Sequence, residues 1–317
     1  MAGNVPISGV DTGILLEAGT NELEILVLQV GDALYGVNVA KVREVLPVPN
    51  INALPESHPA VEGMTEIRGQ VVQLVNLKQF LDGGCEDSRP RPTDKMMIME
   101  FNEDFIGFRV HGVDQIWRNS WDQVRGVPHI AGIDAPVTAV APIGDKMVLM
   151  LDFEAIGAAV GMSRDTLQAQ RDDLAGFTRQ GDELIVFADD SRMIRQMLAE
   201  TLTDAGFTNI RGFSDGAEAW DYLSSVATED SPEATRRKVA ALISDVEMPQ
   251  MDGLNLTRRV RANAALSDLP IILFSSIVSK DNNKKGEQVG ASAQVAKPRY
   301  AELVHTLHGF LQPAAVV

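Results

Sequence analysis

Apolar runs of strand length, each ending at a polar residue, constrain the fold of the C-terminal part of the chain most strongly. The runs and the polar residues that follow them are 184–188 before Asp189 and Asp190, 239–244 before Asp245, 271–274 before Ser275, and a shorter run before Lys297. Such runs alternating with polar or helix-like stretches are typical of a parallel sheet with crossover helices. Ligands of these sheets sit beyond the carboxyl ends of the strands, so we expect the five polar residues to converge on one edge.

The residue types at this edge suit one reaction. Asp189, Asp190 and Asp245 bring together three carboxylates, and their mutual repulsion favours a hard dication such as Mg²⁺. A hydroxyl from Ser275 and an ammonium from Lys297 beside that metal are what a transferring phosphoryl group requires. One acidic residue at a strand end is usually a helix N-cap, but this ordered set indicates an aspartate that accepts phosphate.

Residues 182–317 resemble the receiver domain of two-component systems. The stretch 244–253, SDVEMPQMDG, is similar to that family's D-x-x-M-P-x-M-D-G signature, and the spacing from Asp245 to Ser275 and Lys297 matches it. The resemblance implies that Asp245 is the nucleophile toward a phosphohistidine and that Ser275 and Lys297 hold the phosphoryl oxygens. Gly253 is expected to permit the tight loop after the site. The implied Mg²⁺ ligands are Asp190, Asp245 and the main-chain carbonyl of Glu247, with Asp189 acting through water.

Two features depart from the receiver pattern. The interval between Asp190 and Asp245 is longer than usual in that family, and we interpret the polar, Pro-containing residues 228–238 as a surface loop. Gln294 stands where the family often has an aromatic switch residue, three places before the lysine. We therefore expect the phosphorylation signal to leave by a change in how this domain packs against the rest of the chain.

Residues 21–160 predict a separate all-β domain. Short strand-like segments occur at 24–30, 33–39, 71–77, 96–101, 105–110 and 147–151. Turn signals such as Gly31-Asp32 and Gly144-Asp145 separate them, and many short strands at close spacing are typical of a barrel. We interpret the Met-rich segment 96–99 as core packing. Residues 1–20 predict a mobile arm, and residues 161–181 predict a helical linker before the receiver-like part.

Three ordered segments of the β domain resemble the CheW-like coupling family: 35–45 (YGVNVAKVREV), 66–77 (EIRGQVVQLVNL) and 105–113 (FIGFRVHGV). The resemblance implies two packed barrels that form a scaffold without catalysis. It implies that the groove between the barrels binds a chemoreceptor tip and that barrel faces bind a CheA-type histidine kinase. Glu44 and Arg68 fall at positions that the family uses for contact.

The order of the two domains resembles the CheV type of chemotaxis coupling protein. The fold implied is an all-β double SH3-like barrel followed by an α/β flavodoxin-like, doubly wound parallel sheet. The function implied is that of a cytoplasmic adaptor, recruited to chemoreceptor arrays at the inner membrane. It would be regulated by phosphorylation of Asp245, or would drain phosphate through it, without turning over a separate substrate.

Two other classes of function remain open. A phosphohydrolase of the haloacid-dehalogenase type uses the same chemistry, but its nucleophilic aspartate comes early, whereas here the acidic pair precedes Asp245. A response regulator whose β domain has another output, such as nucleic-acid binding, would need a basic and aromatic surface. The chain carries a net charge of −16 and only 5% aromatic residues, so we expect no nucleic-acid partner. No apolar run has the length of a membrane span, so we expect no direct membrane insertion.

Overall fold

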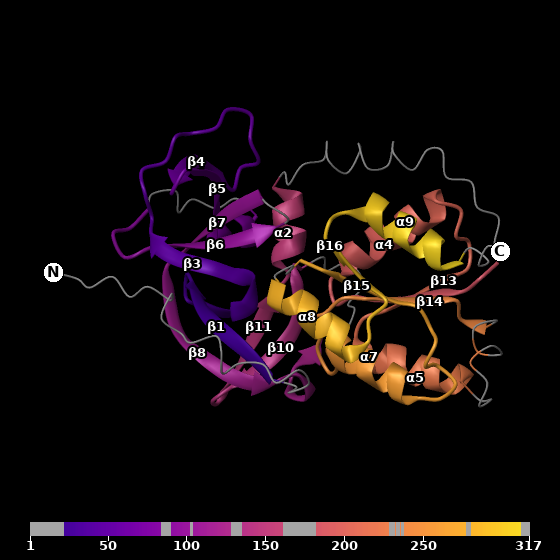
Figure 1. Ribbon diagram of the computed structural model, residues 1–317. Helices are drawn as coiled ribbons and strands as arrows, with labels where there is room; N and C mark the ends of the chain where they lie inside the picture. Colours follow the sequence, from indigo (N-terminus) through magenta and orange to yellow (C-terminus); the bar gives the residue numbers. More distant parts are fainter. Residues whose placement is uncertain are drawn as a thin grey trace. The chain divides into compact units, whose positions relative to one another are not determined.

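The computed structural model describes residues 22–83, 90–101, 104–127, 135–160, 182–227, 232, 235, 238–276 and 280–311 (Figure 1). The chain forms two compact units: among the described residues, 22–120 and 135–160 belong to the first, and 121–127 and those from Asp182 onward belong to the second. The predicted arm at 1–20 and the predicted linker at 161–181 lie outside the described residues.

Two β-sheets contain the strands between residues 22 and 151, as the all-β prediction required. The six-stranded sheet has the order β8-β1-β2-β11-β10-β9, with the bounds β1 Glu22–Val30, β2 Ala33–Asn38, β8 Gly112–Ser120, β9 Arg125–Gly126, β10 Val137–Ile143 and β11 Lys146–Leu151. The five-stranded sheet has the order β3-β6-β7-β5-β4, with the bounds β3 Val42–Pro47, β4 Val61–Ile67, β5 Gln70–Asn76, β6 Lys95–Phe101 and β7 Asp104–Val110. The short helices are η3 Val39–Lys41, α1 Leu77–Leu81, η4 Trp121–Gln123 and α2 Phe153–Ala159. Every predicted strand is present, except that Val39 and Leu77 begin helices.

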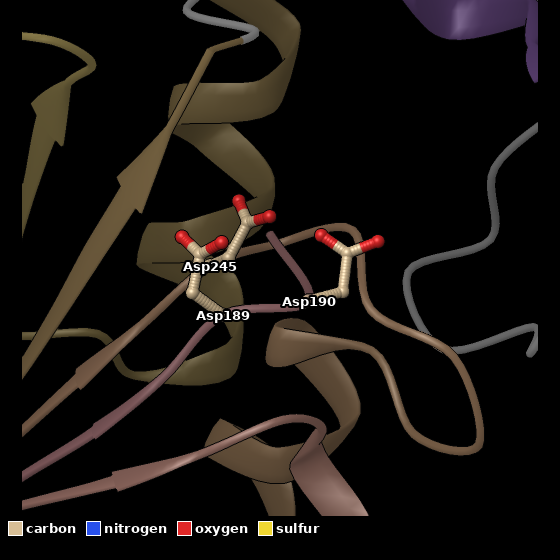
Figure 2. Close-up of side chains that lie close together, drawn as sticks. All are labelled: Asp189, Asp190 and Asp245. Atoms are coloured by element: carbon tan, nitrogen blue, oxygen red, sulfur yellow. The ribbon is translucent and has the colours of Figure 1, made fainter. Parts of the chain in front are cut away.

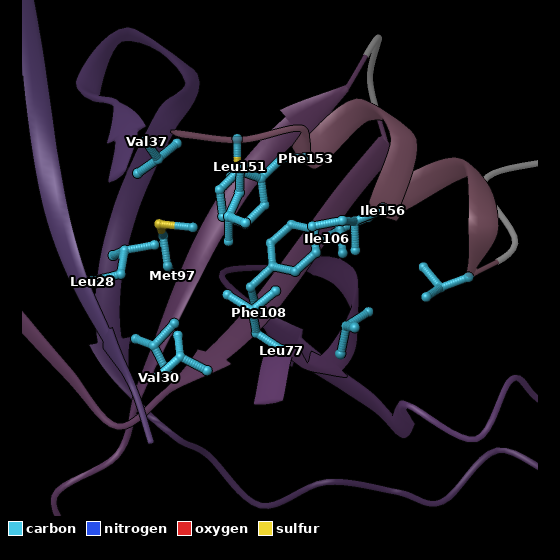
Figure 3. Packing of buried hydrophobic residues seen from close by; sticks show 14 of the residues in the cluster. Leu28, Val30, Val37, Leu77, Met97, Ile106, Phe108, Leu151, Phe153 and Ile156 are labelled. Carbon is cyan, nitrogen blue, oxygen red and sulfur yellow. The ribbon is translucent and has the colours of Figure 1, made fainter. Parts of the chain in front are cut away.

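The core of this unit lies between its two sheets. Leu28 and Val37 from the six-stranded sheet and Met97 and Phe108 from the five-stranded sheet share one buried cluster (Figure 3). Phe108 meets Phe153 of α2 edge to face, with ring centroids 4.9 Å apart. Burying one such apolar side chain contributes about 1.5–3 kcal/mol.

The Met-rich strand β6 contributes to the core on both of its faces. Met96, Met97 and Met99 are all fully buried. Met97 and Met99 pack between the sheets, whereas Met96 packs with Leu74 and Ile98 on the other side. The prediction of core packing for this segment is confirmed.

A two-residue turn joins β4 to β5. Ile67 pairs with Gln70, and the intervening Arg68 and Gly69 have φ values of 51° and 81°. Positive φ at both central residues is the geometry that matches the twist of a hairpin. Glycine adopts it freely, whereas it is uncommon for an arginine. The turn therefore fixes Arg68 at the tip of the hairpin.

The second unit is a five-stranded parallel sheet with the order β13-β12-β14-β15-β16. Its strands are β12 Ile185–Ala188, β13 Ile210–Phe213, β14 Ala241–Ser244, β15 Ile271–Ser275 and β16 Ala293–Ala296. Its helices are α4 Arg192–Asp204, α5 Gly216–Val226, α7 Gly253–Ala262, α8 Lys280–Val289 and α9 Tyr300–Leu311.

Helices cover both faces of this sheet (Figure 1). Along β12, Ile185 and Phe187 pack with α4 and α9, whereas Val186 and Ala188 pack with α5 and α7. Alternate residues of a strand face opposite sides, so a strand buried on both sides is apolar throughout. The prediction of a doubly wound parallel sheet is confirmed.

One local prediction in this unit was wrong. In the stretch 228–238, interpreted above as a surface loop, the described residues Pro232, Thr235 and Lys238 are helical. Thr235 is buried, and its carbonyl accepts a hydrogen bond from Val239 N at 2.8 Å. Polar composition concealed this helix because only one of its described residues faces inward.

Within the described residues, no helix is both long and apolar enough to span a membrane.

Candidate functional site

The parallel sheet brings the predicted residues to one edge. Asp189 and Asp190 follow β12, Asp245 follows β14, Ser275 ends β15 and Lys297 follows β16. The strand ends are level because Ala188 pairs with Ser244, and Ser275 pairs with Ala296. The site predicted from strand ends is therefore assembled in space.

Three carboxylates form the centre of this edge. Asp189, Asp190 and Asp245 each offer an oxygen, and these oxygens lie within 4.8 Å of one another (Figure 2). Asp189 and Asp245 are buried, whereas Asp190 is partly exposed. Gathering like charges out of water is unfavourable unless a cation neutralises them. A set of oxygen donors open to solvent on one side fits a hard dication such as Mg²⁺. Glu247, 9% exposed, lies two residues further along the same loop.

Lys297 places a positive charge directly against two of these carboxylates. Its Nζ lies 2.7 Å from Asp189 Oδ2 and 3.2 Å from Asp245 Oδ2, and its side chain is 4% exposed. Asp245 Oδ1 accepts a hydrogen bond from Val246 N at 2.7 Å. The main-chain N–H of Lys297 donates to the carbonyl of Ser275 at 3.0 Å. The Lys297 ammonium can offset only one of the three carboxylate charges, and a dication would offset more of them.

Gly253 lets the loop after Asp245 fold tightly because it has no side chain, and not because it adopts a left-handed backbone conformation. Its φ is not in the left-handed region. A Cβ at this position would overlap the main-chain carbonyl of Asp245. The neighbouring Asp252 caps α7 by accepting a hydrogen bond from Asn255 N at 2.7 Å, and burial raises the pKa of the Asp252 carboxyl. Close backbone approach therefore explains the glycine.

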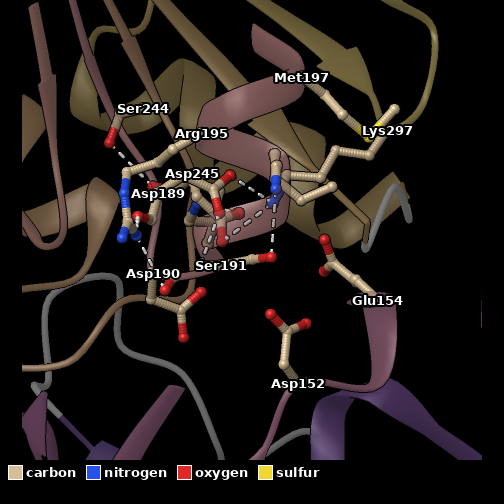
Figure 4. Close-up of polar contacts among 12 residues, drawn as sticks. Asp152, Glu154, Asp189, Asp190, Ser191, Arg195, Met197, Ser244, Asp245 and Lys297 are labelled. Carbon is tan, nitrogen blue, oxygen red and sulfur yellow. Dashed lines mark hydrogen bonds and ion pairs between the residues drawn. The ribbon is translucent and has the colours of Figure 1, made fainter. Parts of the chain in front are cut away.

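Two residues of the site were missed in the sequence. Arg195 Nη1 donates to the main-chain carbonyls of Asp189, at 2.6 Å, and Asp190, at 3.0 Å (Figure 4). Ser191 N donates to Asp189 Oδ1 at 3.0 Å, and Ser191 Oγ caps α4 by accepting from Ile194 N. Serine directly before a helix is an N-cap signal that could have been found. Contacts of a side chain with main-chain atoms leave no such signal.

Gln294, which stands where receivers often have an aromatic switch residue, lies on β16. The amide of Gln294 lies against Gly286 of α8, where a Cβ on Gly286 would overlap it. A glutamine amide at a partly buried position requires hydrogen-bonding partners, unlike a phenyl ring. The contact makes Gln294 part of the packing between β16 and α8.

The two partner-binding candidates of the first unit contact each other. Arg68 Nη2 lies 3.0 Å from Glu44 Oε2, with 77% of the arginine side chain exposed and 19% of the glutamate side chain exposed. Their charges therefore meet on a surface where the arginine remains open to solvent.

Comparison with protein families agrees with both units. Residues 24–160 match the model of the CheW-like domain, and residues 185–308 match that of the response regulator receiver domain. The chain is therefore a CheW-like β domain followed by a receiver domain.

The whole chain is similar to chemotaxis proteins named CheV. It is 28% identical to the chemotaxis protein CheV3 of Helicobacter pylori, over 84% of this chain and 85% of that protein. It is 25% identical to CheV1 of the same organism, over 97% of this chain and 99% of that protein. The chemotaxis protein CheY4 of Vibrio cholerae is 30% identical over 41% of this chain and all of that chain, with a TM-score of 0.35. That score is low, so the assignment depends on the sequence matches.

Proposed function

We propose that this protein is a chemotaxis adaptor that couples chemoreceptors to a CheA-type histidine kinase and accepts a phosphoryl group on Asp245. The observation that carries the proposal is the buried contact of Asp245 with Lys297 beside the acidic pair, in a receiver joined to a CheW-like domain. The CheW-like domain would act as a scaffold without a reaction of its own, in keeping with an adaptor.

Asp245 would react as a nucleophile. One oxygen of its carboxylate attacks the phosphorus of a phosphohistidine, and the phosphorus–nitrogen bond breaks as its electron pair passes to the imidazole, which takes a proton from solvent. The product is an acyl phosphate on Asp245. Attack of water on the phosphorus then breaks the new oxygen–phosphorus bond and restores the carboxylate and inorganic phosphate.

The surrounding residues would orient this transfer. Val246 N holds Asp245 Oδ1, which leaves Oδ2 facing Lys297. The Lys297 ammonium and the Ser275 hydroxyl would then bind phosphoryl oxygens. A bound Mg²⁺ would neutralise charge on those oxygens, held by Asp190, Asp245 and the Glu247 carbonyl, with Asp189 acting through water.

Coupling would depend on the first domain. The charge pair of Glu44 and Arg68, at the surface of the five-stranded sheet, supports a docking role because the arginine is exposed at a fixed turn. The acidic net charge of −16 disfavours a nucleic-acid partner and leaves receptor tips and kinase as the proposed partners. Binding to them would recruit the protein to receptor arrays.

The proposal is tested by reconstitution. The purified chain is incubated with a CheA-type kinase, ATP and receptor-containing membranes, and both sedimentation and phosphate on the chain are measured. We expect the chain to sediment with receptor and kinase and to gain phosphate that the Asp245→Asn variant does not gain. Absence of the chain from the pellet would contradict coupling, and equal phosphate on both proteins would contradict the acceptor assignment.

A further inference from the structure

Arg195 lies on the first turns of α4 and points back toward the acidic pair. A single nitrogen, Nη1, donates to the main-chain carbonyl oxygens of both Asp189 and Asp190 (Figure 4). We infer that Arg195 is a positioning residue for the dication site, acting through the backbone that carries the two carboxylates. The inference rests on the proposed metal-dependent phosphorylation and adds a residue to it.

The carbonyl groups of Asp189 and Asp190 lie in the segment between β12 and α4. β12 ends at Ala188 and α4 begins at Arg192, so the intervening residues lie between the ladder of the sheet and the regular bonds of the helix. Main-chain carbonyls in such a segment need partners, because an unpaired buried one is unfavourable. Arg195 provides a charged donor to two successive carbonyls, and hydrogen bonds from an ionised donor are stronger than neutral ones.

Several contacts hold Asp189 in place. Ser191 N and Lys297 Nζ bind its two carboxylate oxygens, and Arg195 binds its main-chain carbonyl. Asp190 is the more exposed of the pair, and the direction of its carboxylate depends on the main-chain dihedrals on either side of it. Fixing the Asp190 carbonyl therefore narrows where its carboxylate can point. The guanidinium thus supports both acidic side chains through their main-chain carbonyls.

Outer groups that orient metal ligands commonly change metal affinity by about 10- to 100-fold when removed. We expect Arg195→Met, which keeps an unbranched apolar chain but has no donor, to weaken Mg²⁺ binding to the full-length protein by about tenfold. Arg195→Lys retains the charge but places its donor at a shorter reach, so it should recover only part of the lost affinity.

A matched control variant separates the effect of losing the Arg195 contacts from the effect of losing one positive charge. Arg192 is an exposed residue on the same turn, so Arg192→Met removes the same charge from the same helix end. Its Mg²⁺ affinity should stay within about twofold of the wild type, because screening weakens exposed charges. An equal loss in Arg192→Met and Arg195→Met would show that charge alone matters and would overturn the inference.

Mg²⁺ binding is measured by calorimetric titration of the full chain with magnesium chloride. A second readout uses metal-free protein: amide exchange in the peptide that contains Ser191 should be faster in Arg195→Met than in the wild type. Unchanged affinity and unchanged exchange in Arg195→Met would overturn the inference. If that variant does not fold, Arg195→Gln, too short to reach both carbonyls, takes its place with the same expected loss.

The experiment also distinguishes this inference from the proposed function. Asp190→Asn removes a proposed ligand and should abolish measurable binding. If the wild type itself binds no Mg²⁺, the proposed metal site fails. If the wild type binds and Asp190→Asn does not, the site stands, and Arg195 is judged by its own variants.

Discussion

Arg68 and Glu44 form an ion pair at 3.0 Å although they belong to opposite ends of the strand order of the five-stranded sheet. Glu44 lies on β3, and Arg68 follows β4, with β6, β7 and β5 between these two edge strands. Strands are spaced about 4.8 Å apart, so a flat sheet would hold the two side chains far apart. The sheet therefore curls until its edges approach, as in a barrel.

Truncation of Arg68 should affect recruitment more than stability. An exposed ion pair contributes about 0–1 kcal/mol to folding, whereas a central interface arginine commonly costs more than about 1 kcal/mol of binding energy when removed. We expect Arg68→Ala to leave the melting temperature nearly unchanged and to weaken cosedimentation with receptor and kinase. Arg118→Ala, which removes another exposed arginine paired with a glutamate, is the control. Wild-type cosedimentation of Arg68→Ala would show that this residue has no docking role.

Asp245→Asn should abolish phosphorylation while leaving the fold intact. The amide is nearly isosteric with the carboxylate but is a poor nucleophile. Incorporation of phosphate from a CheA-type kinase is measured by intact mass. Asp221→Asn, at an exposed position on α5, should be labelled like the wild type. Labelling of Asp245→Asn at the wild-type level would place the acceptor elsewhere.

Gly286→Ala should destabilise the receiver even though alanine favours helices by about 1 kcal/mol. The added methyl group would overlap the Gln294 amide, and overpacking of this kind costs about 1–3 kcal/mol. Gly309 of α9 has no atom within 4 Å of its would-be Cβ, so Gly309→Ala should be neutral or stabilising. Urea unfolding compares the two variants. A stable Gly286→Ala would mean that Gln294 moves away at little cost.

Removal of the buried Arg109 should be strongly destabilising. Arg109 of β7 donates from Nη1 to Asp94 Oδ2 at 2.8 Å and from Nε to Glu62 Oε2 at 3.0 Å. Arg109→Met leaves the buried Asp94 carboxylate and the partly buried Glu62 carboxylate without that cation, and breaking a buried pair costs about 3–5 kcal/mol. Adding Glu62→Gln and Asp94→Asn should recover much of the loss in urea unfolding. Equal stability of Arg109→Met and the wild type would show that the carboxylates find other partners.

Asp252→Asn should change how stability depends on pH. Burial raises the pKa of the Asp252 carboxyl above its ordinary value of 3.8, so the folded state binds this proton more tightly than the unfolded state. That contribution to stability is present below 3.8 and is lost as the pH rises through the raised pKa. Asparagine caps a helix equally well and does not titrate. Urea midpoints should therefore favour Asp252→Asn increasingly from acidic to neutral pH, and parallel curves would contradict this.

The receiver site could be predicted because its residues are fixed by the topology of the sheet. Strand-length apolar runs determine the parallel strands, and the residues directly after them must meet at one edge, as Asp189 and Asp245 do. The contribution of Arg195 could not be predicted, because its side chain binds main-chain carbonyls. Such a contact requires no particular side chain in the partner residues, so the sequence carries no sign of it. The pairing of Glu44 with Arg68 was equally hidden, since it depends on how far a sheet curls. Strand β13 was missed because a short edge strand with Arg211 and Gly212 lacks a continuous apolar run.

Oxidation of the buried methionines of β6 would report transient unfolding of the first domain. A thioether is oxidised to the sulfoxide only where peroxide can reach it, and the product is polar and bulky. Met147, 61% exposed, should be oxidised readily in the folded protein, whereas Met96, Met97 and Met99 should stay reduced. A core methionine that is oxidised during an opening event becomes polar and no longer packs between the sheets, so opening in the presence of peroxide leaves a stable chemical mark. Peptide mass spectrometry of stored protein would therefore count past unfolding of this domain independently of the receiver.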